Sequence, residues 1–157
     1  MKPAIRCFTI VLLVATFAAS AFAAKTCSAV GGVILTNLGG FGSIDGSPTT
    51  LGVATGDLKG ALGVQIVSAS PDFTTIKVQH HWVTENGETL SVDPATAHGT
   101  FVAPALLAIT DYKIHLSGGT GSFANATGNM SAIGEIDFST GDAVLRYSGN
   151  VCRPDKD

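Results

Sequence analysis

The stretch Gly-Gly-Thr-Gly-Ser-Phe-Ala-Asn-Ala-Thr-Gly at residues 118–128 surrounds one aromatic side chain, Phe123, with four glycines and small polar residues. Glycine permits sharp bends and left-handed backbone conformations, so the chain can wrap around Phe123 and bury it. We expect Phe123 to plug the end of a β-barrel. A phosphate-binding loop would need a lysine followed by a helix, and neither accompanies these glycines.

Alternation of apolar and polar residues on the N-terminal side of this stretch predicts β-strands. Residues 74–83 read Thr-Thr-Ile-Lys-Val-Gln-His-His-Trp-Val, and one face of this strand would carry Ile76, Val78, His80 and Trp82. Residues 111–116 alternate in the same way, with Tyr112 on the apolar face. We therefore expect both of these faces to be buried.

Turn residues divide the remaining chain into short segments. Asn86-Gly87 predicts a two-residue type I′ hairpin turn, and residues 139–142 predict a second hairpin. About eight short strands are expected, at residues 27–38, 49–55, 58–69, 74–83, 89–93, 111–116, 129–138 and 143–151. Such a pattern is typical of an all-β sandwich or barrel, with the longest loops at residues 39–48 and 94–104.

The first 24 residues predict a secretory signal peptide. Lys2 and Arg6 precede an apolar run at residues 8–19, which is short for a bilayer span, and residues 21–23 form a small-residue cleavage signal. We expect residues 1–23 to be removed and residues 24–157 to form a single β-barrel domain without a membrane span. The alternative is an uncleaved N-terminal membrane anchor.

Two cysteines, Cys27 and Cys152, remain after the predicted cleavage. An even number of cysteines in an exported chain favours a disulfide. This bridge would join the first strand to the last, and terminal strands are neighbours in a closed sheet. The alternative is a pair of buried free thiols, and the absence of a Cys-x-x-Cys motif argues against a redox enzyme.

Composition excludes several function classes. The chain has 157 residues, of which 45% are hydrophobic, and a formal net charge of −3. Its nine Lys and Arg residues are scattered, so we expect no nucleic-acid binding.

No motif predicts a metal site or a hydrolase. His80 and His81 point to opposite faces of one strand, while His98 and His115 lie far along the chain without ligand spacing. No Gly-x-Ser-x-Gly motif is present. We expect neither a metal nor a cofactor.

The pattern of residues 118–128 resembles a segment of the allene oxide cyclase and dirigent-like β-barrel superfamily. The continuation at residues 129–152 is similar to the final hairpin of these proteins, and residues 56–60 and 86–90 show weaker similarity. The resemblance implies an eight-stranded antiparallel closed β-barrel with an apolar cavity. Plant members cyclise or couple reactive intermediates, whereas exported bacterial members with terminal cysteines, to which this chain is most similar, mostly have no assigned function.

Four residues are candidates for the wall of a ligand pocket, because each combines a polar atom with an expected inward face: His80, Trp82, Tyr112 and Tyr147. Ordinary core packing is the alternative for each of them. Glu135 is expected to face solvent, since it alternates with Ile136 and Phe138. We assign no catalytic residue.

Two functions follow from these observations. The first is a secreted barrel that binds a small apolar molecule without further chemistry. The second is a cofactor-independent cyclase or isomerase that holds a reactive hydrophobic substrate in one conformation, which lowers the barrier through orientation. The sequence makes no prediction about the oligomeric state.

Overall fold

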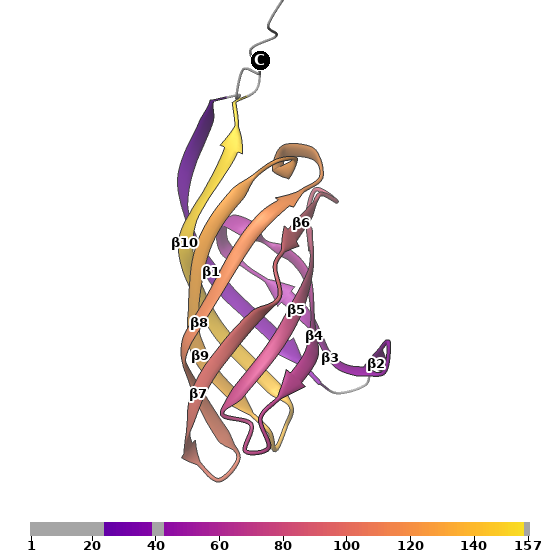
Figure 1. Ribbon diagram of the computed structural model, residues 1–157, viewed down its shortest axis with the longest axis vertical. Coiled ribbons are helices and arrows are strands. Elements are labelled where there is room, and N and C mark those ends of the chain that lie inside the picture. The colour runs from indigo at the N-terminus through magenta and orange to yellow at the C-terminus, as the bar shows by residue number, and fades with distance from the viewer. Residues whose placement is uncertain (1–23, 39–42, 156–157) are drawn as a thin grey trace, which may run out of the picture.

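The protein is an all-β structure in a computed structural model that describes residues 24–38 and 43–155 (Figure 1). The predicted signal peptide, residues 1–23, lies outside the described residues. The strands are β1 (Lys25–Asn37), β2 (Ser43–Ile44), β3 (Ser47–Ala54), β4 (Gly60–Ala69), β5 (Thr75–Thr84), β6 (Thr89–Val92), β7 (Ala95–Ala103), β8 (Leu106–Gly119), β9 (Thr127–Asp137) and β10 (Asp142–Pro154). Two short 3₁₀ helices, η1 (Gly56–Leu58) and η2 (Gly121–Phe123), interrupt them.

The strands pair antiparallel in a ring. β1 pairs with β10 on one side and with β3 on the other, which closes the sheet. β6 and β7 each pair with β5 and with β8, so together they occupy one strand position in the ring. Among the described strands, β2 pairs only with β3. Within the described residues the ring therefore has eight strand positions, which confirms the predicted closed antiparallel barrel.

The segment at residues 94–104, expected as a long loop, is instead strand β7. Its residues pair with β5 and β8, and Ala95 and Ala97 face the core. The sequence of β7 alternates weakly between apolar and polar residues, because it consists largely of alanine, glycine and threonine. Pro94 separates β7 from β6, because proline has no N–H to donate to the ladder.

The β5–β6 hairpin also differs from the expectation. Gly87 has a left-handed backbone, with φ of 79°, whereas Asn86 does not. The Gly87 N–H donates to the Thr84 carbonyl at 2.9 Å, and the Thr84 N–H donates to the Glu88 carbonyl at 2.8 Å. These bonds define a three-residue loop, in which only the last residue needs the left-handed region.

The glycine-rich stretch closes one end of the barrel, shown at the top of Figure 1. The Phe123 side chain is only 3% exposed, as predicted, and the Arg153 guanidinium lies 4.3 Å from the centre of its ring. The Glu88 carboxylate accepts hydrogen bonds from the N–H and the hydroxyl of Ser122, both at 2.7 Å. Gly121 has a left-handed backbone, with φ of 57°, and a Cβ there would lie 2.2 Å from this carboxylate, so another residue would be strained and would displace the Glu88 side chain.

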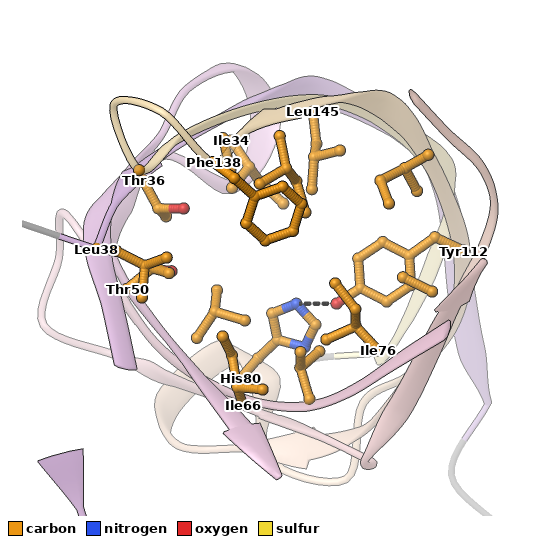
Figure 2. Close-up of a pocket in the computed structure, with 17 residues that line it drawn as sticks. Ile34, Thr36, Leu38, Thr50, Ile66, Ile76, His80, Tyr112, Phe138 and Leu145 are labelled. Atoms are coloured by element: carbon orange, nitrogen blue, oxygen red, sulfur yellow. Dashed lines mark hydrogen bonds between the residues drawn. The ribbon is translucent and has the colours of Figure 1, made fainter. Parts of the chain in front are cut away.

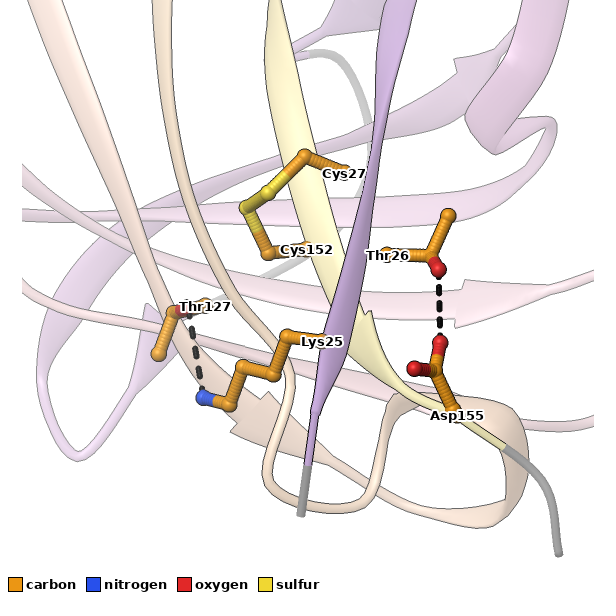
Figure 3. The surroundings of a disulfide bond; sticks show 6 residues. All are labelled: Lys25, Thr26, Cys27, Thr127, Cys152 and Asp155. Carbon is orange, nitrogen blue, oxygen red and sulfur yellow. Dashed lines mark hydrogen bonds between the residues drawn. A yellow bond between two sulfur atoms is a disulfide. The ribbon is translucent and has the colours of Figure 1, made fainter. Parts of the chain in front are cut away.

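A disulfide joins the first and last strands at the same end of the barrel (Figure 3). Cys27 and Cys152 occupy directly opposite positions on β1 and β10, with their Cα atoms 3.9 Å apart. The Thr26 hydroxyl donates to the Asp155 carboxylate beside the bridge at 2.6 Å. The predicted disulfide is thus confirmed, and a disulfide is consistent with an extracellular protein.

Helices of membrane-spanning length and apolarity are absent from the described part of the chain.

The disulfide is expected to stabilise the fold substantially. It links residues 125 positions apart, and chain entropy assigns such a loop about 4–5 kcal/mol of unfolding free energy. Urea denaturation of the oxidised protein, compared with the Cys27→Ser, Cys152→Ser double variant, measures this difference. Recovery of two alkylatable thiols from the native protein without reductant would contradict the bridge.

Candidate functional site

A cavity of about 70 Å³ lies inside the barrel (Figure 2). It is in the half away from the disulfide, because Phe138 and Gly141 line it and the β9–β10 turn lies at the opposite end of β10 from Cys152. Its wall is built mainly from inward-facing aliphatic side chains of several strands, among them Ile34, Val64, Ile76, Ala97, Ile109 and Leu145. Strand alternation places these side chains inside, since successive residues point to opposite faces. Among the lining residues that the structure describes, none is Asp, Glu, Lys or Arg.

The cavity extends toward the barrel end at which the β9–β10 turn lies. Half-buried apolar side chains line it there, including Ile66, Ile136 and Phe138. The Phe138 ring contacts Phe73 and Phe101, with ring centres 5.6 and 5.9 Å apart. This end is therefore apolar and partly open to solvent.

Two polar side chains meet in the cavity wall. The Tyr112 hydroxyl lies 2.7 Å from Nε2 of His80, and the two rings stack with their centres 5.7 Å apart. Ala97 on β7 pairs with Tyr112 on β8 and with Ile76 on β5, four residues before His80. The Tyr112 side chain therefore reaches diagonally across the sheet to His80 on β5.

Burial determines the protonation of this pair. His80 is 3% exposed, and burial lowers its pKa to about 4, with a smaller contribution from the charge of His81. Burial likewise raises the pKa of Tyr112 above its ordinary value. Both side chains are therefore neutral at pH 7.

Two polar atoms of the cavity wall have no hydrogen-bond partner among the residues described. One is Nδ1 of His80 and the other is the hydroxyl oxygen of Thr50 on β3, both of them buried. Buried polar groups in native proteins almost always have a partner. Thr50 was not a candidate from the sequence, because a threonine in a strand is ordinary and gives no signal of its own.

Trp82 and Tyr147 lie together at the closed end of the barrel. Their rings meet edge to face, with centres 5.7 Å apart. The Trp82 indole N–H donates to the Leu58 carbonyl at 2.8 Å, and the Leu58 N–H donates to the Tyr147 hydroxyl at 3.0 Å. That hydroxyl donates in turn to the Thr55 carbonyl at 2.8 Å. The pair thus holds Leu58, the buried residue of η1, inside the barrel.

The four residues expected in one pocket therefore form two pairs. His80 and Tyr112 line the cavity, whereas Trp82 and Tyr147 pack around Leu58 and are not among its lining residues. Glu135 is exposed, as its strand position indicated.

The remaining histidines take part in small surface contacts. His98 Nδ1 lies 3.2 Å from the Thr75 hydroxyl, and His115 Nδ1 lies 2.7 Å from the Asp93 carboxylate. Over the described ranges, no three His, Cys, Asp or Glu residues gather in a way that could hold a metal ion.

Comparisons with known proteins relate the chain to others through its fold. No family model matches the sequence, and no curated protein matches it either. Matching solved structures include the pterocarpan synthase dirigent protein GePTS1, which is 15% identical, with a TM-score of 0.51. The match covers 85% of this chain and 88% of that one. At this identity the similarity shows a dirigent-like barrel fold alone.

Removing the Tyr147 hydroxyl should destabilise the closed end. A Tyr147→Phe change leaves the buried N–H of Leu58 without an acceptor, which costs about 1–3 kcal/mol. Urea denaturation should show this loss as a lower midpoint with an unchanged slope. An unchanged midpoint would show that the hydrogen bonds to η1 contribute nothing to stability.

Acid should destabilise the protein through His80. An unfolded histidine binds a proton near pH 6.5, whereas folded His80 binds one only near pH 4. Its contribution is complete above pH 6.5 and is lost as the pH falls toward 4, by about 3 kcal/mol. The unfolding free energy should depend less steeply on pH across this range in His80→Gln than in the wild type. The wild-type dependence should remain in His98→Gln, which alters an exposed histidine. Equal slopes in the wild type and His80→Gln would contradict the burial effect.

Proposed function

We propose that this protein is an exported β-barrel that binds a small apolar molecule in the cavity beside His80 and Tyr112. The observation that carries this proposal is a wall of aliphatic side chains with two buried, unpartnered polar atoms, on His80 and Thr50. Each such atom costs about 1–3 kcal/mol, which apolar side chains would avoid. A ligand that supplies hydrogen bonds would recover that cost.

The size of the cavity indicates the size of the ligand. Its volume of about 70 Å³ exceeds the roughly 10–15 Å³ that one water molecule needs. It lies well below the roughly 300–1,000 Å³ of sites for drug-sized ligands. We therefore expect a ligand as slender as one alkyl chain or one small ring. A larger ligand requires the half-buried side chains at the open end, such as Ile66 and Phe138, to move aside.

Export is the second part of the proposal. Residues 1–23 carry the charge, apolar run and cleavage signal of a secretory signal peptide. The Cys27–Cys152 disulfide supports this, because disulfides form and persist in oxidising compartments.

A cyclase or isomerase is the alternative function, and the His80–Tyr112 pair favours it. A neutral hydrogen-bonding pair at the wall of an apolar cavity is able to orient a reactive substrate and steer its charge. The similar solved structure is named a pterocarpan synthase. In an enzyme, His80→Gln would slow turnover more than about tenfold with little loss of binding, whereas in a binding protein it would weaken affinity only modestly.

Methyl NMR tests the binding site directly. Titration with methylenecyclohexane, a small apolar ring, should shift the isoleucine methyl signals of the cavity wall, namely those of Ile34, Ile76 and Ile109. The signals of Ile114 and Ile133, which are not among the lining residues, serve as internal controls.

A matched pair of variants completes this test. Ala97→Ile adds methyl groups to the cavity wall and should abolish the shifts, whereas Ala61→Ile adds the same groups to an exposed position and should preserve them. Shifts that survive Ala97→Ile, or that appear equally at Ile133, would place binding elsewhere. Absence of any saturable shift would overturn the proposed function.

A further inference from the structure

The His80–Tyr112 pair has one more proton donor than it can use. A neutral imidazole carries one N–H and a tyrosine carries one O–H, so the pair holds two donors. The single hydrogen bond between Nε2 and the hydroxyl uses one of them. Whichever group donates in that bond, the other proton has no acceptor among the described residues, because Nδ1 has no partner and the Tyr112 hydroxyl makes no other hydrogen bond there.

The two directions of this hydrogen bond leave different atoms unpaired. If Tyr112 donates to Nε2, the proton sits on Nδ1, as a buried N–H without an acceptor. Orphaned N–H groups of this kind are rare in native proteins. If Nε2–H donates instead, Nδ1 is an unpaired acceptor, and the Tyr112 proton is free to rotate into the cavity. Figure 2 shows both side chains projecting inward, joined through Nε2.

The cavity contains nothing that would pair with a charged ligand. Its lining residues, all within the described part of the chain, include no Lys, Arg, Asp or Glu. His80 is neutral at pH 7, since burial lowers its pKa to about 4. A carboxylate moved into this site would lose its hydration without gaining a counter-charge.

We infer that the ligand is a neutral apolar molecule with a hydrogen-bond-accepting oxygen, such as a ketone, ester or ether, and that the Tyr112 hydroxyl donates to this oxygen. This inference rests on the proposed function and specifies the chemistry of its ligand. The hydroxyl of Thr50, on the opposite wall in Figure 2, is a further unpartnered donor for a second oxygen.

Two probes of nearly equal shape test the inference. Cyclohexanone carries a carbonyl oxygen where methylenecyclohexane carries a CH₂ group, so the two differ mainly in the acceptor. Both should shift the methyl signals of Ile34 and Ile76 in the wild-type protein. Tyr112→Phe should weaken cyclohexanone binding about fivefold, the equivalent of one net hydrogen bond. Methylenecyclohexane binding should change by less than about twofold. Cyclohexanecarboxylate at pH 7 should bind at least about tenfold more weakly than cyclohexanone.

The outcomes separate this inference from the proposed function. Failure of both neutral probes to bind would overturn the two together. Binding of both, with an equal response to Tyr112→Phe, would overturn the oxygen acceptor and leave the apolar site standing. Binding of the carboxylate as tightly as the ketone would overturn the requirement for a neutral ligand.

A second measurement needs no variant. Nitrogen-15 NMR of the imidazole in the cyclohexanone complex should show the His80 proton on Nε2, because the Tyr112 proton is then used by the ligand. A proton on Nδ1 in that complex would contradict the inferred donor.

Discussion

The backbone N–H and carbonyl of Leu58 must find hydrogen bonds inside an apolar barrel, and this requirement organises one half of the molecule. η1 brings Leu58 into the barrel with 1% of its surface exposed. The Trp82 indole and the Tyr147 hydroxyl then bond the carbonyl and the N–H of this residue. Without these partners, burying the turn would leave two polar groups unsatisfied. Because the two aromatic rings are used in this way, the end of the barrel near the disulfide is filled by side chains.

The other half of the barrel contrasts with this packed end. There the wall is aliphatic, and the His80–Tyr112 pair and Thr50 leave polar atoms without partners. One strand, β5, contributes to both halves, since Trp82 serves the packed end and His80 serves the cavity. This contrast on the same strands supports the proposed ligand site, because functional sites often retain unsatisfied groups at a cost in stability.

The sequence predicts well which strand faces point inward. It predicts poorly at which level along the barrel each inward residue lies. Alternation in residues 74–83 correctly placed His80 and Trp82 on one buried face. Two residues along a strand span roughly 6.6 Å, however, and that rise separates the cavity from the packed end. The four predicted pocket residues therefore divided into two pairs.

Two further features depend on tertiary contacts. β7 is recognisable only between its partners β5 and β8, because Ala95 and Ala97 are too small to give a clear apolar pattern. The missing hydrogen-bond partner of the Thr50 hydroxyl is recognisable only once the apolar residues around it are known. The glycine-rich stretch depends on local backbone conformation, and the disulfide depends on the first and last strands being neighbours. Both features were therefore predictable from the sequence.

The barrel interior consists of one packed end and one apolar cavity. Xenon enters dry apolar cavities without needing hydrogen bonds, so a crystal held under xenon pressure tests this division without assuming a ligand. This division predicts one ordered xenon atom beside Ile34, Ile76 and Tyr112 and none between Trp82 and Tyr147. A barrel interior without xenon, or a xenon atom at the Trp82–Tyr147 end, would contradict it.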